Sequence, residues 1–159
     1  MDEVTRRPRV LLADDHSLML AGLRRLVEET CDVVGAVEDG RALVEAVQHL
    51  EPDLILLDIS MPLLNGIDAA RQIRKLHHPA KLIFLTMHTS PSYVTEAFHV
   101  GASGYLLKRS APMELPLAIE AVLKGQQYLT PSITKPVLAQ TMEREEAPAL
   151  KGSAVALTP

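Results

Sequence analysis

Short runs of apolar, often β-branched residues alternate along this chain with longer stretches in which apolar residues recur every three or four positions. The short runs have the length and composition of β-strands. They lie at residues 10–13, 33–37, 54–57, 82–85 and 104–107. Because the run at 54–57 is apolar throughout, it is typical of a strand that is covered on both faces of a sheet.

The apolar spacing between and after these runs predicts five helices. Asp39 is expected to cap the second helix, and Ser90 followed by Pro91 is typical of the start of the fourth. One local conflict concerns the last helix, because Pro116 falls where that helix should already be running. We therefore expect the last helix to begin late, near Leu115, or to have a distorted first turn.

Five strands that alternate with five helices predict an α/β fold: a doubly wound five-stranded parallel sheet with helices on both faces. Residues 8–125 are expected to form this unit. The pattern changes after Gly125, where residues 128–131 are interpreted as a turn. Residues 126–159 are predicted to be a linker that contains a short helix over 135–142, followed by a segment rich in Ala, Pro and charge.

The amino-acid composition excludes several classes of function. Hydrophobic residues make up 47% and aromatic residues 3%, so the core should be aliphatic, while a net charge of -4 without a basic run argues against direct nucleic-acid binding. A single cysteine, Cys31, excludes an internal disulfide and suits a reducing compartment. No apolar run approaches the roughly 20 residues that span a bilayer. We expect a soluble, cytoplasmic protein that does not enter membranes.

The ends of the predicted strands carry the candidate chemistry. In an open parallel sheet, ligands bind outside the carboxyl ends of the strands, so the residues at those ends should share one crevice. Each of these residues alone is commonly a cap, a strand residue or a solvated charge, but their combination favours a functional site. The five are Asp14, Asp15, Asp58, Thr86 and Lys108.

Three crowded carboxylates repel one another, and a hard divalent cation with oxygen ligands relieves that repulsion. Mg²⁺ is therefore the expected cofactor. A site that combines Mg²⁺ with an ammonium and a hydroxyl suits a phosphoryl group. One carboxylate could then act as a nucleophile and form an aspartyl phosphate.

Four segments resemble the receiver domains of bacterial two-component response regulators. Residues 14–16 (DDH) resemble the acidic pair of that family, and residues 58–66 (DISMPLLNG) resemble its phosphoacceptor loop. Residues 85–88 (LTMH) are similar to its switch-threonine segment, and residues 101–108 (GASGYLLK) to its lysine segment. The resemblance covers about residues 8–125 and implies the flavodoxin-like (βα)5 receiver fold.

This resemblance implies a role for each matching residue. Asp58 would be the phosphoacceptor, and its partner would be a sensor histidine kinase. Asp15, Asp58 and the backbone carbonyl of Ser60 would hold Mg²⁺, while Asp14 would bind through water or support the site. Lys108 would pair with Asp58 and then with a phosphoryl oxygen.

The resemblance also implies a switch. Thr86 would move toward the phosphoryl group, and Tyr105 would swing inward behind it, which would change the surface around the last two helices. Met87 departs from the small residue that many receivers carry after the threonine, and could narrow access to the acceptor. Ser60 and His88 occupy positions that tune dephosphorylation in the family.

The C-terminal part carries two further resemblances. Residues 125–131 (GQQYLTP) are similar to the segment that closes receivers of the NarL/FixJ subfamily, and residues 157–159 (LTP) resemble the opening of a LuxR-type helix-turn-helix domain. We expect such a domain to follow outside this chain, so that DNA binding and control of transcription would depend on it. The apolar residues of the last helix allow two interpretations, core packing or a homodimer surface.

Three alternatives to a phosphorylation switch fit the sequence less well. A receiver-like interaction module that works without phosphorylation is kept open by Met87. A phosphatase of the haloacid dehalogenase type would carry a second Asp two residues after the nucleophile, where this chain has Ser60. A flavodoxin-like cofactor binder would need a phosphate-binding loop after the first strand, which is absent from the sequence. In the leading interpretation the protein is no metabolic enzyme and catalyses only its own phosphorylation and dephosphorylation.

Overall fold

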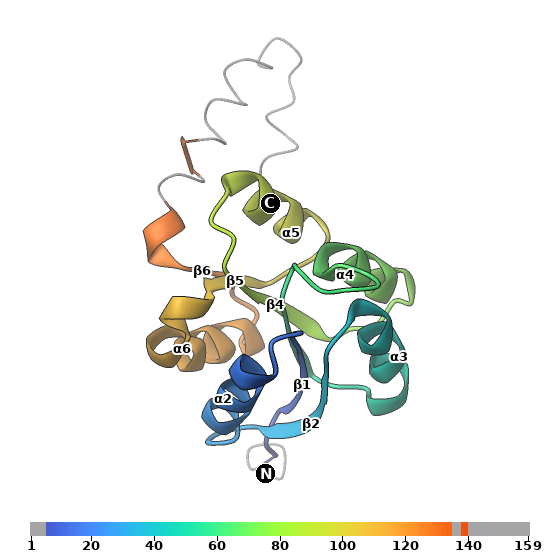
Figure 1. The fold of residues 1–159 in the computed structure, drawn as a ribbon. Coiled ribbons are helices and arrows are strands. Elements are labelled where there is room, and N and C mark those ends of the chain that lie inside the picture. The colour runs from blue at the N-terminus through green and yellow to red at the C-terminus, as the bar shows by residue number, and fades with distance from the viewer. Residues whose placement is uncertain (1–5, 135–137, 140–159) are drawn as a thin grey trace.

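A single parallel sheet forms the centre of the molecule (Figure 1). The computed structural model describes residues 6–134 together with residues 138 and 139. The strand order is β2-β1-β3-β4-β5-β6. The strands are β1 (Arg9–Ala13), β2 (Asp32–Val37), β3 (Leu54–Leu57), β4 (Lys81–Thr86), β5 (Gly104–Leu107) and β6 (Tyr128–Leu129).

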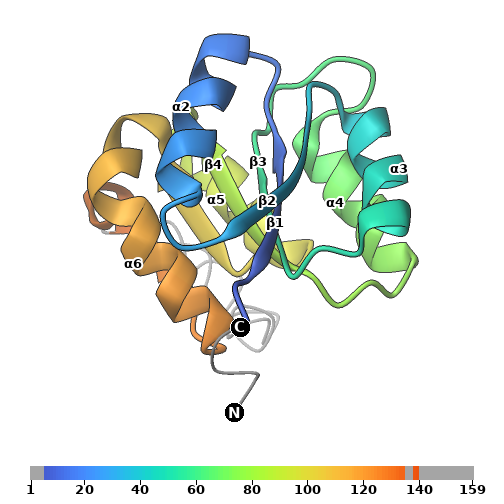
Figure 2. The same ribbon diagram turned by 90° about the horizontal axis from the view of Figure 1, so that it is seen from below.

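Helices cover both faces of the sheet (Figure 2). One apolar cluster joins the sheet to α2 (Ser17–Val27) and α6 (Ala111–Leu123). A second cluster joins the opposite face to α3 (Gly40–Leu50), α4 (Gly66–Lys75) and α5 (Pro91–His99). The predicted doubly wound α/β architecture is therefore confirmed, and its strand order reverses direction at β1 and β3, where such folds place their ligand sites.

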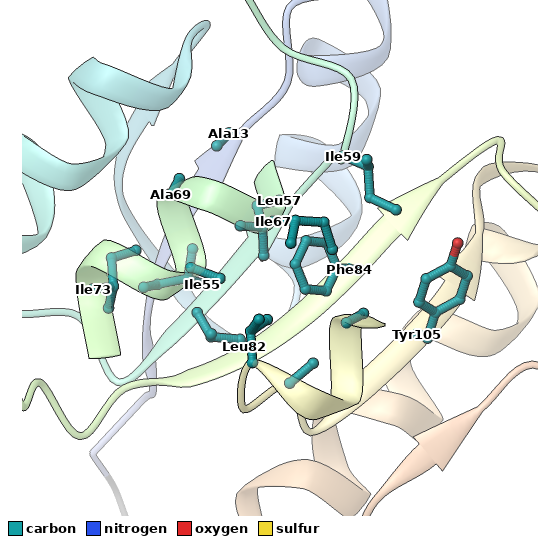
Figure 3. Close-up of a cluster of buried hydrophobic side chains, with 14 of the residues drawn as sticks. Ala13, Ile55, Leu57, Ile59, Ile67, Ala69, Ile73, Leu82, Phe84 and Tyr105 are labelled. Carbon is teal, nitrogen blue, oxygen red and sulfur yellow. The ribbon is translucent and has the colours of Figure 1, made fainter. Parts of the chain in front are cut away.

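The buried faces follow from the sequence pattern. All four residues of β3 are buried, as expected for a central strand covered on both sides. Figure 3 shows the cluster that includes Ile55 and Leu57 of this strand, with Phe84 and Tyr105 on the next two strands. The rings of Phe84 and Tyr105 lie side by side with centroids 6.4 Å apart. Tyr105 thus belongs both to the core and to the predicted switch.

The predicted count of five strands is wrong, because Tyr128 and Leu129 form a sixth strand where a turn was expected. This strand has only two residues, too few for a sequence pattern to reveal it. It forms because β5 offers unpaired backbone groups along its outer side. The Tyr128 amide donates to the carbonyl of Ser103 at 2.9 Å, and the Thr130 amide donates to the carbonyl of Tyr105 at 3.0 Å.

The last helix does not begin late, which was the first of the two alternatives predicted for it. It begins at Ala111, after a single 3-10 turn, η1 (Lys108–Ser110), and continues through Pro116 instead of beginning near Leu115. Pro116 has no amide to donate to Pro112, but both prolines are exposed, so the loss falls on the solvent side of the helix. Burial of the opposite side outweighs this local cost, through Ala111, Leu115, Ala118, Ile119 and Val122.

Two predicted helix caps are confirmed. Asp39 accepts a hydrogen bond from the Ala42 amide at 2.7 Å, and Ser90 accepts one from the Ser92 amide at 3.3 Å. Within residues 6–134 and 138–139, no helix is long and apolar enough to cross a membrane. The helix predicted over 135–142 lies largely outside the described residues, as do the segment from 143 onward and the LuxR-like ending at 157–159.

Candidate functional site

The residues predicted to share a crevice lie together at the carboxyl edge of the sheet. Asp14 and Asp15 follow β1, Asp58 follows β3, Thr86 ends β4 and Lys108 follows β5. All except Asp15 are buried, and 34% of the Asp15 side chain is exposed. Buried polar groups are costly unless they are paired, so the contacts within this group determine what the site can do.

Lys108 is the centre of the buried charge. Its Nζ lies 2.8 Å from Asp14 Oδ2 and 2.8 Å from Asp58 Oδ2, and at most 5% of any of these three side chains is exposed. Burial works against the charged ammonium, but the hydrogen bonds to Asp14 and Asp58 outweigh burial and raise the pKa of Lys108. The ammonium is therefore held in its charged form between two carboxylates.

The position of Asp58 is fixed by the backbone around it. Its Oδ1 accepts a hydrogen bond from the Ile59 amide at 2.6 Å, and its own amide donates to the carbonyl of Ala13 at 3.1 Å. Gly66 lies so close that a Cβ there would come within 1.9 Å of the Asp58 carbonyl oxygen. Only glycine allows this approach, which brings the start of α4 against the residue that directly follows β3.

His16 also contributes to this site, although no role for it was predicted from the sequence. Its Nδ1 lies 3.0 Å from Asp14 Oδ1, 3.2 Å from Asp15 Oδ1 and 3.4 Å from Lys108 Nζ. Its position directly after the acidic pair was the available signal. Ligand atoms of these two aspartates, of His16 and of Asp58 all lie within 4.8 Å of one another. This group could hold a metal ion, and its carboxylate oxygens are donors that suit a hard divalent cation.

The other side of the site is organised around His88. Its amide donates to Thr86 Oγ1 at 3.3 Å, and its carbonyl accepts a hydrogen bond from the Tyr105 hydroxyl at 2.8 Å. Its ring nitrogen Nε2 lies 2.7 Å from Ser60 Oγ, and the ring packs on Tyr93 with centroids 4.6 Å apart. These contacts tie the loop after β3 to the loop after β4, and neither the pairing with Ser60 nor the stacking was predicted.

Tyr105 occupies a fully buried position in this structure. Its burial, followed by the nearby charge of Asp58, raises the pKa of the phenol far above its ordinary value. The buried position is the one that the sequence analysis assigned to Tyr105 after the switch. The movements of Tyr105 and Thr86 stay predictions.

Met87 lies at the opening of the site and is 73% exposed. It lines a cavity of about 500 Å³ together with His16, Leu18 and Lys108, among others. Leu18 is even more exposed, at 88%. The bulky residue that the sequence analysis singled out therefore stands in solvent beside the opening of the site.

The doubly wound sheet, with buried carboxylates at its switch point and a buried lysine paired with them, defines a class of α/β proteins whose site suits a cation and an anionic ligand. Residues 10–120 match the family model of the response regulator receiver domain, and the chain belongs to this family.

Individual relatives agree with this assignment. The chain is 38% identical over 128 residues to the transcriptional regulatory protein DegU of Brevibacillus brevis, which covers 79% of this chain and 54% of DegU. It is 37% identical over 139 residues to the response regulator UvrY of Escherichia coli K12, which covers 86% of this chain and 64% of UvrY. The chain thus spans less than two thirds of the length of these relatives.

Solved structures show the same similarity. A LuxR-family two-component response regulator from Aurantimonas sp. SI85-9A1 is 34% identical with a TM-score of 0.81, over 86% of this chain and 99% of that one. The receiver domain of the response regulator NarL from Mycobacterium tuberculosis is 33% identical with a TM-score of 0.73, over 76% and 99% of the two chains. The predicted resemblance to NarL/FixJ-type receivers is confirmed.

Proposed function

We propose that this chain is a phosphorylation switch in which Asp58 accepts a phosphoryl group from a phosphohistidine of a sensor kinase. A carboxylate oxygen of Asp58 would attack phosphorus, the new O–P bond would form, and the N–P bond would break with its electron pair going to the imidazole. One observation carries this proposal: Lys108 Nζ lies 2.8 Å from the buried Asp58 carboxylate. The same ammonium would neutralise charge on a phosphoryl oxygen.

Mg²⁺ is the proposed cofactor. Asp15 and Asp58, with the backbone carbonyl of Ser60, would hold it, and Asp14 would bind through water or support the site. The donor set fits, since three carboxylates converge within 4.8 Å and offer hard oxygen ligands. When bound, Mg²⁺ would balance the negative charge of the carboxylates and of the incoming phosphoryl group.

The proposed switch acts through Thr86 and Tyr105. Thr86 would move toward the phosphoryl group, and Tyr105 would fill the space behind it. Thr86 Oγ1 at present accepts the amide of His88, and Tyr105 donates to the carbonyl of the same residue. A shift of the loop that carries His88 would therefore change the hydrogen bonds of both residues and would alter the surface formed by α5, β5 and α6.

The output is proposed to lie outside this chain. Residues 8–125 would form the receiver, and 126–159 would lead to a LuxR-type helix-turn-helix domain that contacts DNA and controls transcription. The similarity to DegU, a transcriptional regulatory protein, supports this proposal. So does a structure of the response regulator RcsB in complex with DNA, which is 31% identical to this chain. A homodimer of receivers would fit such an output.

The test is the intact mass of the protein after incubation with Mg²⁺ and phosphoramidate. The parent and Asp68→Asn should gain one phosphoryl group, because Asp68 is an exposed aspartate at the start of α4. Asp58→Asn should gain none, and chelation of Mg²⁺ should abolish the gain in the parent. A folded parent that gains nothing in the presence of Mg²⁺ would refute the proposal and favour an interaction module that works without phosphorylation.

A further inference from the structure

Among residues 6–134 and 138–139, five polar or charged residues are buried, and the proposed mechanism uses four of them. Asp14, Asp58, Thr86 and Lys108 form the site, whereas Thr130 follows the sixth strand and is fully buried. Burying a polar group is unfavourable unless it makes hydrogen bonds, so the partners of Thr130 indicate what it does.

Thr130 is bonded twice to β5. Its amide donates to the carbonyl of Tyr105 at 3.0 Å, and its Oγ1 accepts the amide of Leu107 at 3.1 Å. Tyr105 is the switch residue, and Leu107 immediately precedes Lys108. Thr130 therefore holds the end of β5, which carries Tyr105 and is followed directly by Lys108, from the side opposite to β4.

The hydroxyl of Thr130 accepts a hydrogen bond that the backbone carbonyl of the same residue would otherwise accept. If the parallel ladder continued, the Leu107 amide would donate to the carbonyl of Thr130. That carbonyl instead accepts the Ile133 amide at 3.1 Å and the Thr134 hydroxyl at 3.1 Å, because the chain turns into a helical turn there. Without the hydroxyl of Thr130, the buried amide of Leu107 would have no acceptor in this arrangement.

Side chains that flank Thr130 in the sequence also pack near Tyr105. Leu129 is the register partner of Tyr105 across the β5–β6 pair, as Phe84 is across the β4–β5 pair. Ile133 is buried in the cluster that contains Tyr105 and Phe84. The segment 128–134, which we term the edge segment, thus lies beside the switch tyrosine through both backbone and side chains.

We infer that Thr130 is a positioning residue of the phosphoacceptor site, which fixes the end of β5 and thereby the location of Lys108 and Tyr105. This inference rests on the proposed function of Asp58. It makes Thr130, within the edge segment, a part of the phosphorylation machinery. Because coupling between two sites is reciprocal, a change at Tyr105 should also alter how firmly the edge segment holds the chain that follows it.

The experiment compares phosphorylation rates of the full chain with phosphoramidate and Mg²⁺. Thr130→Val keeps the shape but removes the acceptor, and it should react about tenfold more slowly, since small displacements of catalytic groups have large effects on rate. Thr130→Ser keeps the hydroxyl and should react close to the parent rate. Thr134→Val is the matched control, since the Thr134 hydroxyl donates to the carbonyl of Thr130 and not to β5, and it should also behave as the parent.

Amide hydrogen exchange of Leu107, followed by NMR, gives a second readout. Exchange should be faster in Thr130→Val and unchanged in Thr130→Ser. If Thr130→Val does not fold, Thr130→Cys takes its place, because a thiol is a weak acceptor of similar size.

The outcomes separate the two proposals. A parent that takes up no phosphoryl group contradicts the function proposed for Asp58. If the parent reacts and a folded Thr130→Val reacts equally fast, the positioning role is wrong. Equal slowing in Thr130→Ser and Thr130→Val would also overturn it, since the hydroxyl would then not be the cause.

Discussion

Removal of the Lys108 ammonium gives the sharpest test of the electrostatics of the site. Lys108→Met keeps most of the apolar length of the side chain but leaves the carboxylates of Asp14 and Asp58 without their shared counter-charge. Both carboxylates now lie 2.8 Å from Nζ, and no more than 5% of any of the three side chains is exposed. The variant should therefore be much less stable than the parent.

The size of the effect follows from burial. Breaking a buried ion pair by removing one partner costs about 3–5 kcal/mol, whereas exposed pairs contribute about 0–1 kcal/mol. Lys124→Met is the matched control, because Lys124 pairs with Glu120 at 3.2 Å in a pair whose side chains are both 64% exposed. We expect a large loss of stability in Lys108→Met and almost none in Lys124→Met.

Urea denaturation followed by circular dichroism measures both free energies of unfolding. Added Mg²⁺ should stabilise Lys108→Met more than the parent, because the proposed cation would replace the missing charge and would bind only the folded site. Unfolding of Lys108→Met and Lys124→Met at the same urea concentration would refute the role given to the Lys108 ammonium, as would Mg²⁺ that stabilises Lys108→Met no more than the parent.

Gly66→Ala should cost about 3 kcal/mol or more in urea denaturation, because its Cβ would lie 1.9 Å from a backbone oxygen, while Gly22→Ala in α2 meets nothing within 4 Å and should gain about 0.5–1 kcal/mol. Above pH 10 the free energy of unfolding should fall as pH rises. The pKa values of Lys108 and Tyr105 in the folded protein are raised above their ordinary 10.5 and 10.0, so the unfolded chain releases these protons first. A free energy of unfolding that is constant between pH 9.5 and 11 would contradict this. His88→Ala removes the contact across the opening of the site and should speed loss of the phosphoryl group, measured by intact mass over time, whereas an unchanged lifetime would show that this contact does not shield the acceptor.

Much of the fold could be predicted because local and tertiary preferences agree. The apolar run 54–57 became β3 with the predicted bounds, and the run 104–107 became β5. Asp39 and Ser90 cap helices as expected, since a capping side chain acts on amides two or three residues away. The proximity of the site residues could be predicted because the carboxyl ends of the strands of a parallel sheet meet at one edge.

The features that were not predicted all depend on contacts between residues that are far apart in the sequence. Burial on one side of α6 carries the helix through Pro116, which local propensity alone would forbid. The short strand β6 depends on the free side of β5, and Thr130 has no sequence signal that distinguishes it from an ordinary turn threonine. The pairing of Ser60 with His88 joins residues 28 positions apart, which spacing in the sequence cannot reveal.

The sixth strand also affects how pieces of this protein would behave in solution. The family match ends at residue 120, and a fragment trimmed there would leave the outer side of β5 uncovered. The Ser103 and Tyr105 carbonyls and the Leu107 amide would then face solvent as a template for strands of other molecules. Such a fragment should self-associate more readily than a chain that extends to residue 134, so its apparent oligomeric state would reflect the cut and not the protein.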